Sequence, residues 1–161
     1  MAVSGPRKFV LDTNCFIDAS RTETGARAFA EFCAWAAPGL YLSAVVAAEL
    51  RAGAGGAKER RTLEREVIAP YAGRGRLLTP SCRAWEMLGT TLAALVEDDG
   101  LALRDVRRGF VFDILIARSC RDIGATLVSR NSTDLSRIAK VFSFDFLPPY
   151  PTPSGRRERD N

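Results

Sequence analysis

Short apolar runs alternate along this chain with longer segments that have the apolar spacing of helices. The runs suited to strands are residues 8–11, 40–42, 75–79, 125–129 and 141–144. The helical segments are residues 24–37, a helix capped by Ser43 that reaches Gly53, 57–69, 81–96, 110–121 and 132–139. Strands separated by helices join in parallel through right-handed crossovers, which place helices on both faces of the sheet. The order therefore predicts an α/β sandwich around a central parallel sheet.

The length of the chain suits one such sandwich. It has 161 residues, of which 47% are apolar and 26% charged, a composition typical of a single globular domain with one core. We assign residues 1–147 to this domain. Residues 148–161 contain four prolines and a charged end, which predicts an extended and flexible C-terminal tail.

Histidine is absent from the whole sequence. This excludes Ser-His-Asp and Cys-His nucleophile systems, imidazole acid–base catalysis and every zinc site that uses histidine. The four cysteines lie far apart and form no C-x-x-C pair, so we expect buried thiols in a reducing cytoplasm. Hydrolytic chemistry in this chain must therefore use carboxylates, metals or thiols.

Arginine dominates the charge of the chain. Only three of the 23 basic side chains are lysines, and the net charge is +4. The planar guanidinium suits phosphate and carboxylate partners, so the charge favours a polyanion such as nucleic acid. The N-terminal residues lack the apolar core of a signal peptide, and the longest uncharged run, 32–48, is broken by Pro38-Gly39. We therefore expect a cytoplasmic protein without a membrane span.

Three acidic residues interrupt apolar segments, where a solvated side chain is not expected. Asp12 directly follows the apolar residues 9–11, and Glu49 lies in a helix rich in alanine and valine. Asp113 lies within the apolar segment 110–117. Because burial of an unpaired carboxylate costs roughly several kcal/mol, each of these residues needs a cation, hydrogen-bond donors or a proton.

The predicted topology brings these acids to one edge of the sheet. In an open parallel sheet, ligands bind beyond the carboxyl ends of the strands, where Asp12 is placed by its own strand. Glu49 and Asp113 lie early in helices that begin at the same edge, and a fourth acid, Asp134, follows the predicted strand 125–129. Four carboxylates without histidine predict an all-oxygen site for Mg²⁺ or Mn²⁺.

Two of the acids also have a structural alternative at helix ends. Asp12 could cap the helix that follows its turn. Asp134 lies three residues after Asn131, which is the spacing of a capping box with Asn131 as the N-cap.

The other two acids could be buried partners of arginines. Arg51 lies near Glu49 in the sequence, and Arg118 lies near Asp113. An ion pair would supply the counter-charge that each carboxylate needs. A shared cation explains better why all four acids are expected at one edge.

Four segments, in this order, closely resemble the PIN-domain ribonucleases, and specifically the VapC-type toxins of bacterial toxin–antitoxin pairs. The segments are Leu11-Asp-Thr-Asn14, residues 43–50, residues 112–117 and residues 123–135. The resemblance extends over about residues 8–146. It implies a PIN-like three-layer α/β/α sandwich with a short central parallel sheet of four to five strands.

The resemblance also implies roles for particular residues. The catalytic, metal-coordinating acids would be Asp12, Glu49, Asp113 and Asp134, the last binding metal directly or through water. Polar positions that support the acids or contact substrate would be Asn14, Ser129 and Asn131. Arg130 and Arg51 are candidates for contact with the RNA backbone by position. Val111 and Phe112 stand where many relatives carry a further polar or acidic residue, so the number of metal ions stays open.

The function implied by the resemblance is a Mg²⁺- or Mn²⁺-dependent endoribonuclease that hydrolyses RNA phosphodiester bonds. Such a toxin blocks translation, with tRNA as a reasonable target. Similar toxins are homodimers, and a small antitoxin covers the active site with its C-terminal segment. In this chain the predicted helix 57–69 and the helix that holds Glu49 would form the walls of that groove.

Two other classes of function remain to be distinguished. One is a PIN module that binds RNA or protein without catalysis. The other is phosphoryl transfer to Asp12, as in haloacid-dehalogenase-like phosphatases or receiver domains. The former have a second acid where this chain has Asn14, and the latter a lysine where it has Ser129-Arg130. Both departures disfavour phosphoryl transfer.

Overall fold

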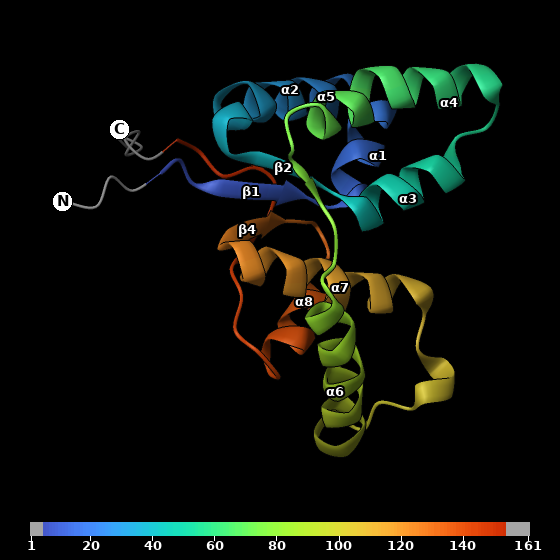
Figure 1. The fold of residues 1–161 in the computed structure, drawn as a ribbon, viewed down its shortest axis with the longest axis vertical. Helices are drawn as coiled ribbons and strands as arrows, with labels where there is room; N and C mark the ends of the chain where they lie inside the picture. Colours follow the sequence, from blue (N-terminus) through green and yellow to red (C-terminus); the bar gives the residue numbers. More distant parts are fainter. Residues whose placement is uncertain (1–4, 154–161) are drawn as a thin grey trace.

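Five short strands pair in parallel to form one sheet at the centre of the molecule. The computed structural model describes residues 5–153. The sheet order is β3-β2-β1-β4-β5 (Figure 1). The strands are β1 (Lys8–Leu11), β2 (Leu40–Ser43), β3 (Leu77–Leu78), β4 (Ala125–Val128) and β5 (Phe146–Leu147).

Eight α-helices connect and cover the strands in the described part of the chain. They are α1 (Thr13–Arg21), α2 (Glu23–Ala36), α3 (Ala44–Gly53), α4 (Ala57–Leu63), α5 (Ala69–Ala72), α6 (Cys82–Asp99), α7 (Arg108–Ile123) and α8 (Ser132–Ala139). Two 3₁₀ turns, η1 (Ala37–Gly39) and η3 (Leu103–Asp105), and a π-helical turn, η2 (Glu64–Ile68), complete the connections. No helix within residues 5–153 has the length and apolar character needed to cross a membrane.

Alternating side chains of β1 point into two separate hydrophobic clusters, one on each face of the sheet. Phe9 and Leu11 pack with Phe32 of α2, whereas Val10 packs with Ile114 of α7 and with residues of α3, α6 and α8. Because successive side chains of a strand point to opposite faces, the molecule has three layers, with helices on both sides of the sheet. This confirms the predicted α/β/α sandwich.

The strand register fixes which residues meet at the carboxyl edge of the sheet. Leu11, the last residue of β1, is paired with Val128, the last residue of β4. One more backbone hydrogen bond extends the pairing beyond the ends of the strands, from the Asp12 amide to the Val128 carbonyl at 3.0 Å. Asp12 and Ser129 therefore leave adjacent strands side by side.

Helix ends follow the signals in the sequence. The Ser43 hydroxyl accepts a hydrogen bond from the Val45 amide at 3.2 Å and caps α3 as predicted. Gly100 ends α6 and Gly124 ends α7, both with a left-handed backbone (φ +67° and +65°) that favours glycine.

Three expectations about the elements were wrong. The first helix, α1, was not predicted as an element of its own. The helical segment 57–69 is divided by η2 and extends to Ala72. The predicted strand 141–144 is a turn after α8, and the last strand is Phe146–Leu147 instead. Phe142 is buried in the core there, so its apolar character reflects packing rather than strand pairing.

Two expectations outside the sheet also change. Cys82 is exposed, while Cys15 and Cys120 are buried as expected. Tyr150, in the segment expected to begin the flexible tail, packs against α2, with its ring centroid 5.3 Å from that of Phe32. The remainder of the expected tail, residues 154–161, lies outside the described residues.

Candidate active site

Asp12 is the centre of a polar network at the carboxyl edge of the sheet. It is 5% exposed and is the N-cap residue of α1. Its Oδ1 accepts a hydrogen bond from the Thr13 amide at 2.7 Å. Its Oδ2 accepts from the Ser129 hydroxyl at 2.6 Å and from Asn14 Nδ2 at 2.9 Å. Asp12 therefore caps a helix, as the structural alternative proposed, and is also held in place from β4.

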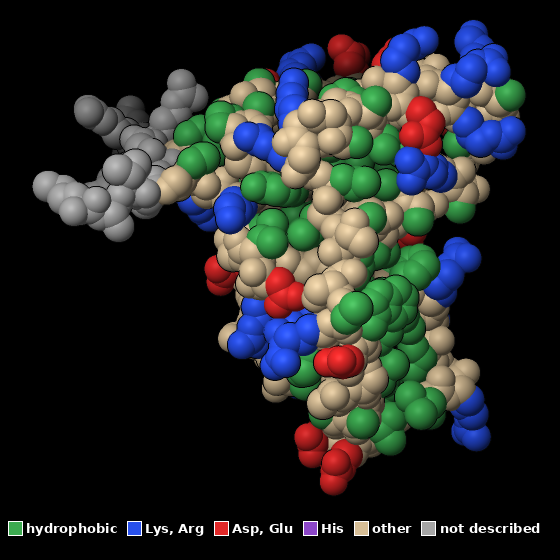
Figure 2. Space-filling view, in the orientation of Figure 1, with side chains coloured by type: hydrophobic (Ala, Val, Ile, Leu, Met, Phe, Trp, Pro, Cys, Tyr) green, Lys and Arg blue, Asp and Glu red, His purple; other side chains and the backbone are tan. Residues whose placement is uncertain are grey.

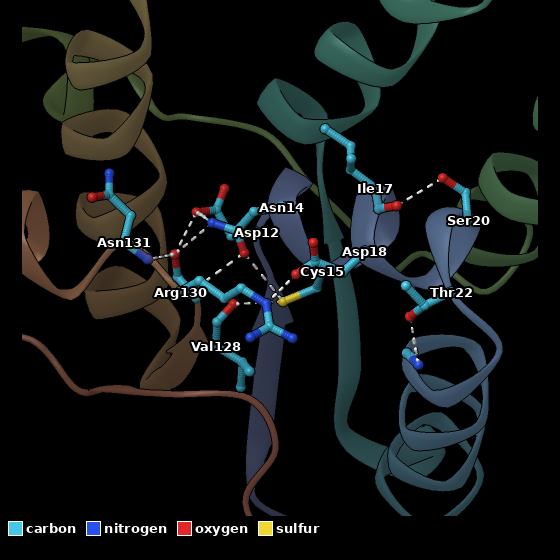
Figure 3. Close-up of polar contacts among 12 residues, drawn as sticks. Asp12, Asn14, Cys15, Ile17, Asp18, Ser20, Thr22, Val128, Arg130 and Asn131 are labelled. Atoms are coloured by element: carbon cyan, nitrogen blue, oxygen red, sulfur yellow. Dashed lines mark hydrogen bonds and ion pairs between the residues drawn. The ribbon is translucent and has the colours of Figure 1, made fainter.

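Asn14 and Ser129 extend this network between α1 and the loop after β4 (Figure 3). Asn14 Nδ2 donates to Ser129 Oγ at 3.0 Å, and Asn14 Oδ1 accepts from the Arg130 amide at 3.2 Å. Ser129 Oγ also accepts from the Asn131 amide at 3.0 Å. The loop 129–131 is thus fixed against α1 by both side chains and backbone.

Asn131 joins two of the acids. Its Nδ2 donates to Asp113 Oδ2 at 2.8 Å and to Asp134 Oδ2 at 3.0 Å. The Asn131 side chain makes no capping hydrogen bond to α8, so the capping-box interpretation is wrong. The amide instead holds together carboxylates from α7 and α8.

Glu49 is positioned by the residue after Asp12. The Thr13 hydroxyl donates to Glu49 Oε2 at 2.5 Å, which connects α1 with α3. The arginine alternatives for Glu49 and Asp113 were wrong, since Arg51 pairs with Glu64 and Arg118 with Asp122.

All four acids line one pocket of about 370 Å³, which we call the acid pocket. The residues that line it are Asp12, Thr13, Asn14, Ile17, Glu49, Arg107, Gly109, Phe110, Asp113, Asn131 and Asp134. The predicted convergence of Asp12, Glu49, Asp113 and Asp134 at one edge of the sheet is therefore observed.

Burial and electrostatic repulsion between the acids in this pocket shift the pKa of Asp113. Burial, and then the charges of Asp12 and Asp134, raise the pKa of Asp113 to about 7. The hydrogen bond from Asn131 lowers this pKa, and the charge of Glu49 raises it. The folded protein therefore disfavours the charged form of Asp113 until a positive charge enters the pocket.

The donor chemistry of the acid pocket fits a hard divalent cation. Four carboxylates and an amide face one space, and Asp12 and Asp113 are buried. Among the described residues, no group of three acidic side chains is spaced to hold one ion as the side chains stand. Thr13 and Asn131 donate hydrogen bonds to Glu49, Asp113 and Asp134 in this arrangement. A cation would satisfy the same oxygens by charge.

Two predicted arginines lie elsewhere. Arg130 forms an ion pair with Asp18 and lines a separate pocket of about 790 Å³ between α2 and residues 149–153. Arg51 is bound to Glu64 through Nε and Nη2. Neither side chain lines the acid pocket, so their contact with the RNA backbone stays a prediction.

Sequence reasoning missed Thr13 and Arg107, which both line the acid pocket. Thr13 stands between Asp12 and Asn14, so its place in that turn was a usable signal. Arg107 is the N-cap residue of α7, and its Nη2 lies 3.4 Å from Asp134 Oδ2. It is one arginine among many, and nothing in its spacing distinguishes it.

Comparison with known proteins agrees with this geometry. The family model described as PIN domain matches residues 9–141. No curated protein sequence gives a significant match.

Several solved structures share the fold. FitAcB from Neisseria gonorrhoeae has a TM-score of 0.64 at 19% identity, covering 88% of this chain and 97% of that one. DNA-bound VapBC from Salmonella typhimurium has a TM-score of 0.61 at 22% identity, covering 88% and 98%. VapBC-1 from nontypeable Haemophilus influenzae has a TM-score of 0.60 at 21% identity, covering 87% and 96%. With the family match extending from β1 to the end of α8, this chain belongs to the PIN-domain family.

Proposed function

We propose that this protein is a metal-dependent endoribonuclease and the toxin of a toxin–antitoxin pair. The observation that carries the proposal is the convergence of four carboxylates in one pocket of a PIN domain that contains no histidine. Carboxylates alone can perform phosphodiester hydrolysis when they hold a divalent cation.

The residues that would hold Mg²⁺ or Mn²⁺ are Asp12, Glu49, Asp113 and Asp134. Such an ion would supply Lewis-acid chemistry at this site, by polarising a phosphate and favouring the formation of hydroxide from water. The ion would also remove the cost of charging Asp113 in a buried site that it shares with other carboxylates.

The surrounding residues orient the acids. Ser129 and Asn14 fix Asp12 through one oxygen, Oδ2. Asn131 fixes Asp113 and Asp134 together, and Thr13 fixes Glu49. Each acid thus accepts a hydrogen bond from a neutral donor, which keeps the carboxylate in place, and only Asp134 also contacts a charged one, Arg107.

RNA is the substrate class that we propose, with tRNA as the target and loss of translation as the consequence. Support comes from the VapC-type resemblance, from the arginine-rich composition and from the fold shared with VapBC and FitAB, whose structures include DNA-bound forms. The same resemblance supports an antitoxin as partner.

We also propose that the toxin is a homodimer that uses the exposed face of α6. Trp85 is 56% exposed and Val96 is 39% exposed. They lie 11 residues apart, about three helical turns, and so share one face. Figure 2 shows hydrophobic side chains gathered over the lower part of the molecule, where Figure 1 places α6. Exposed apolar patches of this kind mark interfaces.

Cleavage of total RNA by the purified protein tests the proposed activity. We expect cutting with Mg²⁺ or Mn²⁺, none with EDTA, and a loss of at least about 100-fold in Asp113→Ala. Glu86→Gln, an exposed acid on α6, is the matched control and should cut like wild type. If folded, antitoxin-free wild type and Asp113→Ala behaved alike, the non-catalytic binding module would replace the nuclease.

A further inference from the structure

Arg107 lies at the rim of the acid pocket. Its side chain is 80% exposed, and its Nη2 lies 3.4 Å from Asp134 Oδ2. Among the described residues that line the pocket, it alone carries a positive charge. It is also the N-cap residue of α7, without a side-chain capping bond, so its charge lies beside the positive end of the helix dipole.

The contact with Asp134 holds Arg107 only weakly. The separation of 3.4 Å is longer than the roughly 2.7–2.9 Å of a strong charge-assisted hydrogen bond. Asp134 Oδ2 already accepts from Asn131 at 3.0 Å, and an ion pair with an exposed partner contributes little to stability. The guanidinium can therefore exchange this contact for another anion at little cost.

Three other arginines that are near the acids in the sequence or in the fold have contacts outside the acid pocket. Arg51 and Arg130 are paired with Glu64 and Asp18 outside the acid pocket. Arg108, next to Arg107, lies over the Phe112 ring at 5.9 Å from its centroid and does not line the pocket. Arg107 is thus the described arginine placed to contact a ligand that enters between the acids.

RNA carries several phosphates, and a single cation between the acids would balance the charge of only one of them. The four carboxylates repel every phosphate near them, and a cation between them would offset this for the phosphate that it binds. We infer that Arg107 binds a second backbone phosphate of the RNA, adjacent to the phosphate held at the acids. This inference rests on the proposed nuclease function and adds a phosphate-binding residue to it.

Salt dependence of RNA binding tests this role separately from catalysis. The probe is a short, fluorescently labelled, mixed-sequence single-stranded RNA, and binding is followed by anisotropy over a range of KCl concentrations. All proteins keep the four acids, and Ca²⁺ replaces Mg²⁺ in the binding reactions to prevent cleavage. We expect Arg107→Ala to weaken binding about 10-fold or more. The slope of log K against log salt should also fall by about 0.7, the value for one lost phosphate contact.

Two matched variants complete the test. Arg108→Ala removes the same charge one residue away and should keep the wild-type slope, while Arg107→Lys should keep the slope and recover part of the affinity. In otherwise wild-type protein, Arg107→Ala should lower kcat/KM for RNA without weakening Mn²⁺ binding in calorimetry.

The outcomes separate this inference from the proposed function. If wild type cuts RNA but Arg107→Ala and Arg108→Ala bind RNA alike, the phosphate-binding role of Arg107 is wrong and the nuclease stands. A weaker Mn²⁺ affinity in Arg107→Ala, with an unchanged salt slope, would likewise overturn it. If wild type neither cuts nor binds RNA, both the nuclease and the role of Arg107 fail.

Discussion

At the scale of single residues, the acid pocket combines charges that oppose one another with neutral groups that hold them. Asp12 and Asp113 were identifiable from the sequence because a carboxylate among apolar residues needs an explanation. Arg107 was not, because a guanidinium acquires its role only through the tertiary contact it makes, here with Asp134. For Thr13 the sequence offered only its place in the turn, and its contact with Glu49 became visible in the fold.

The raised pKa of Asp113 predicts that the stability of the metal-free protein depends on pH. The pKa of Asp113 is raised from 3.8 to about 7, chiefly by burial and then by Asp12. Because the folded state binds the proton more tightly than the unfolded state, stability falls as the pH rises from about 4 through about 7. In EDTA above about pH 8, Asp113→Asn should therefore raise Tm, by on the order of 5 °C.

Calorimetric melting curves at several pH values check this prediction. Well below pH 4, where Asp113 is protonated in both the folded and the unfolded state of the wild type, the two proteins should melt alike. Excess Mn²⁺ should stabilise wild type more than Asp113→Asn, because the variant binds the ion more weakly. A variant that is less stable than wild type in EDTA at high pH would contradict the repulsion.

Thr13 offers a second test at this scale. Thr13→Val keeps the shape but removes the hydroxyl that donates to Glu49 at 2.5 Å. We expect about a tenfold weaker Mn²⁺ affinity, because Glu49 loses its orienting donor. Thr13→Ser should restore most of that affinity in titration calorimetry. Equal Mn²⁺ affinities for Thr13→Val and wild type would show that Thr13 does not position Glu49 for metal binding.

At the scale of elements, the sequence was most informative where one signal dominated. The helix 132–139 and the strand 8–11 were predicted with their observed bounds. The segment 141–144 was wrongly predicted as a strand, because its apolar residue Phe142 packs into the core from a turn and pairs with no strand. The helix Thr13–Arg21 was missed although its apolar side chains share one face, because it is short and begins directly after the Asp12 turn, where the sequence was interpreted as a loop.

The end of α7 can be tested through its glycine. Gly124 has φ +65°, and an added Cβ would meet no atom within 4 Å. Gly124→Ala should therefore cost about 1 kcal/mol through backbone strain alone. Gly53→Ala, in a helix with equally open space, is the control and should be neutral or stabilising. Urea unfolding of both variants measures the difference, and an equally stable Gly124→Ala would contradict it.

The exposed face of α6 carries a prediction about assembly. Trp85→Glu places a charge on the face that we propose as the dimer interface and should give a monomer in light scattering. Arg83→Glu, on an exposed position of the same helix, changes charge without removing apolar surface and is the control. A wild-type monomer, or a dimer unaffected by Trp85→Glu, would refute the interface.

At the scale of the whole molecule, the parallel topology explains why residues far apart in the sequence form one site. The four acids come from four different segments and line one pocket. Asp12 directly follows β1, and Glu49, Asp113 and Asp134 lie in the first two turns of α3, α7 and α8. The fold class and this convergence were predictable because they depend only on strand order and direction. The hydrogen bonds between the segments were not, because they depend on side-chain conformations that the folded molecule selects.

The central claim is that the four acids together hold a divalent cation, and titration of Mn²⁺ into the folded wild-type protein tests it most directly. The account predicts binding that is weakened at least about tenfold in Asp113→Asn and unchanged in Glu86→Gln. Wild-type protein that binds no Mn²⁺, or an Asp113→Asn variant that binds it as tightly, would contradict the account.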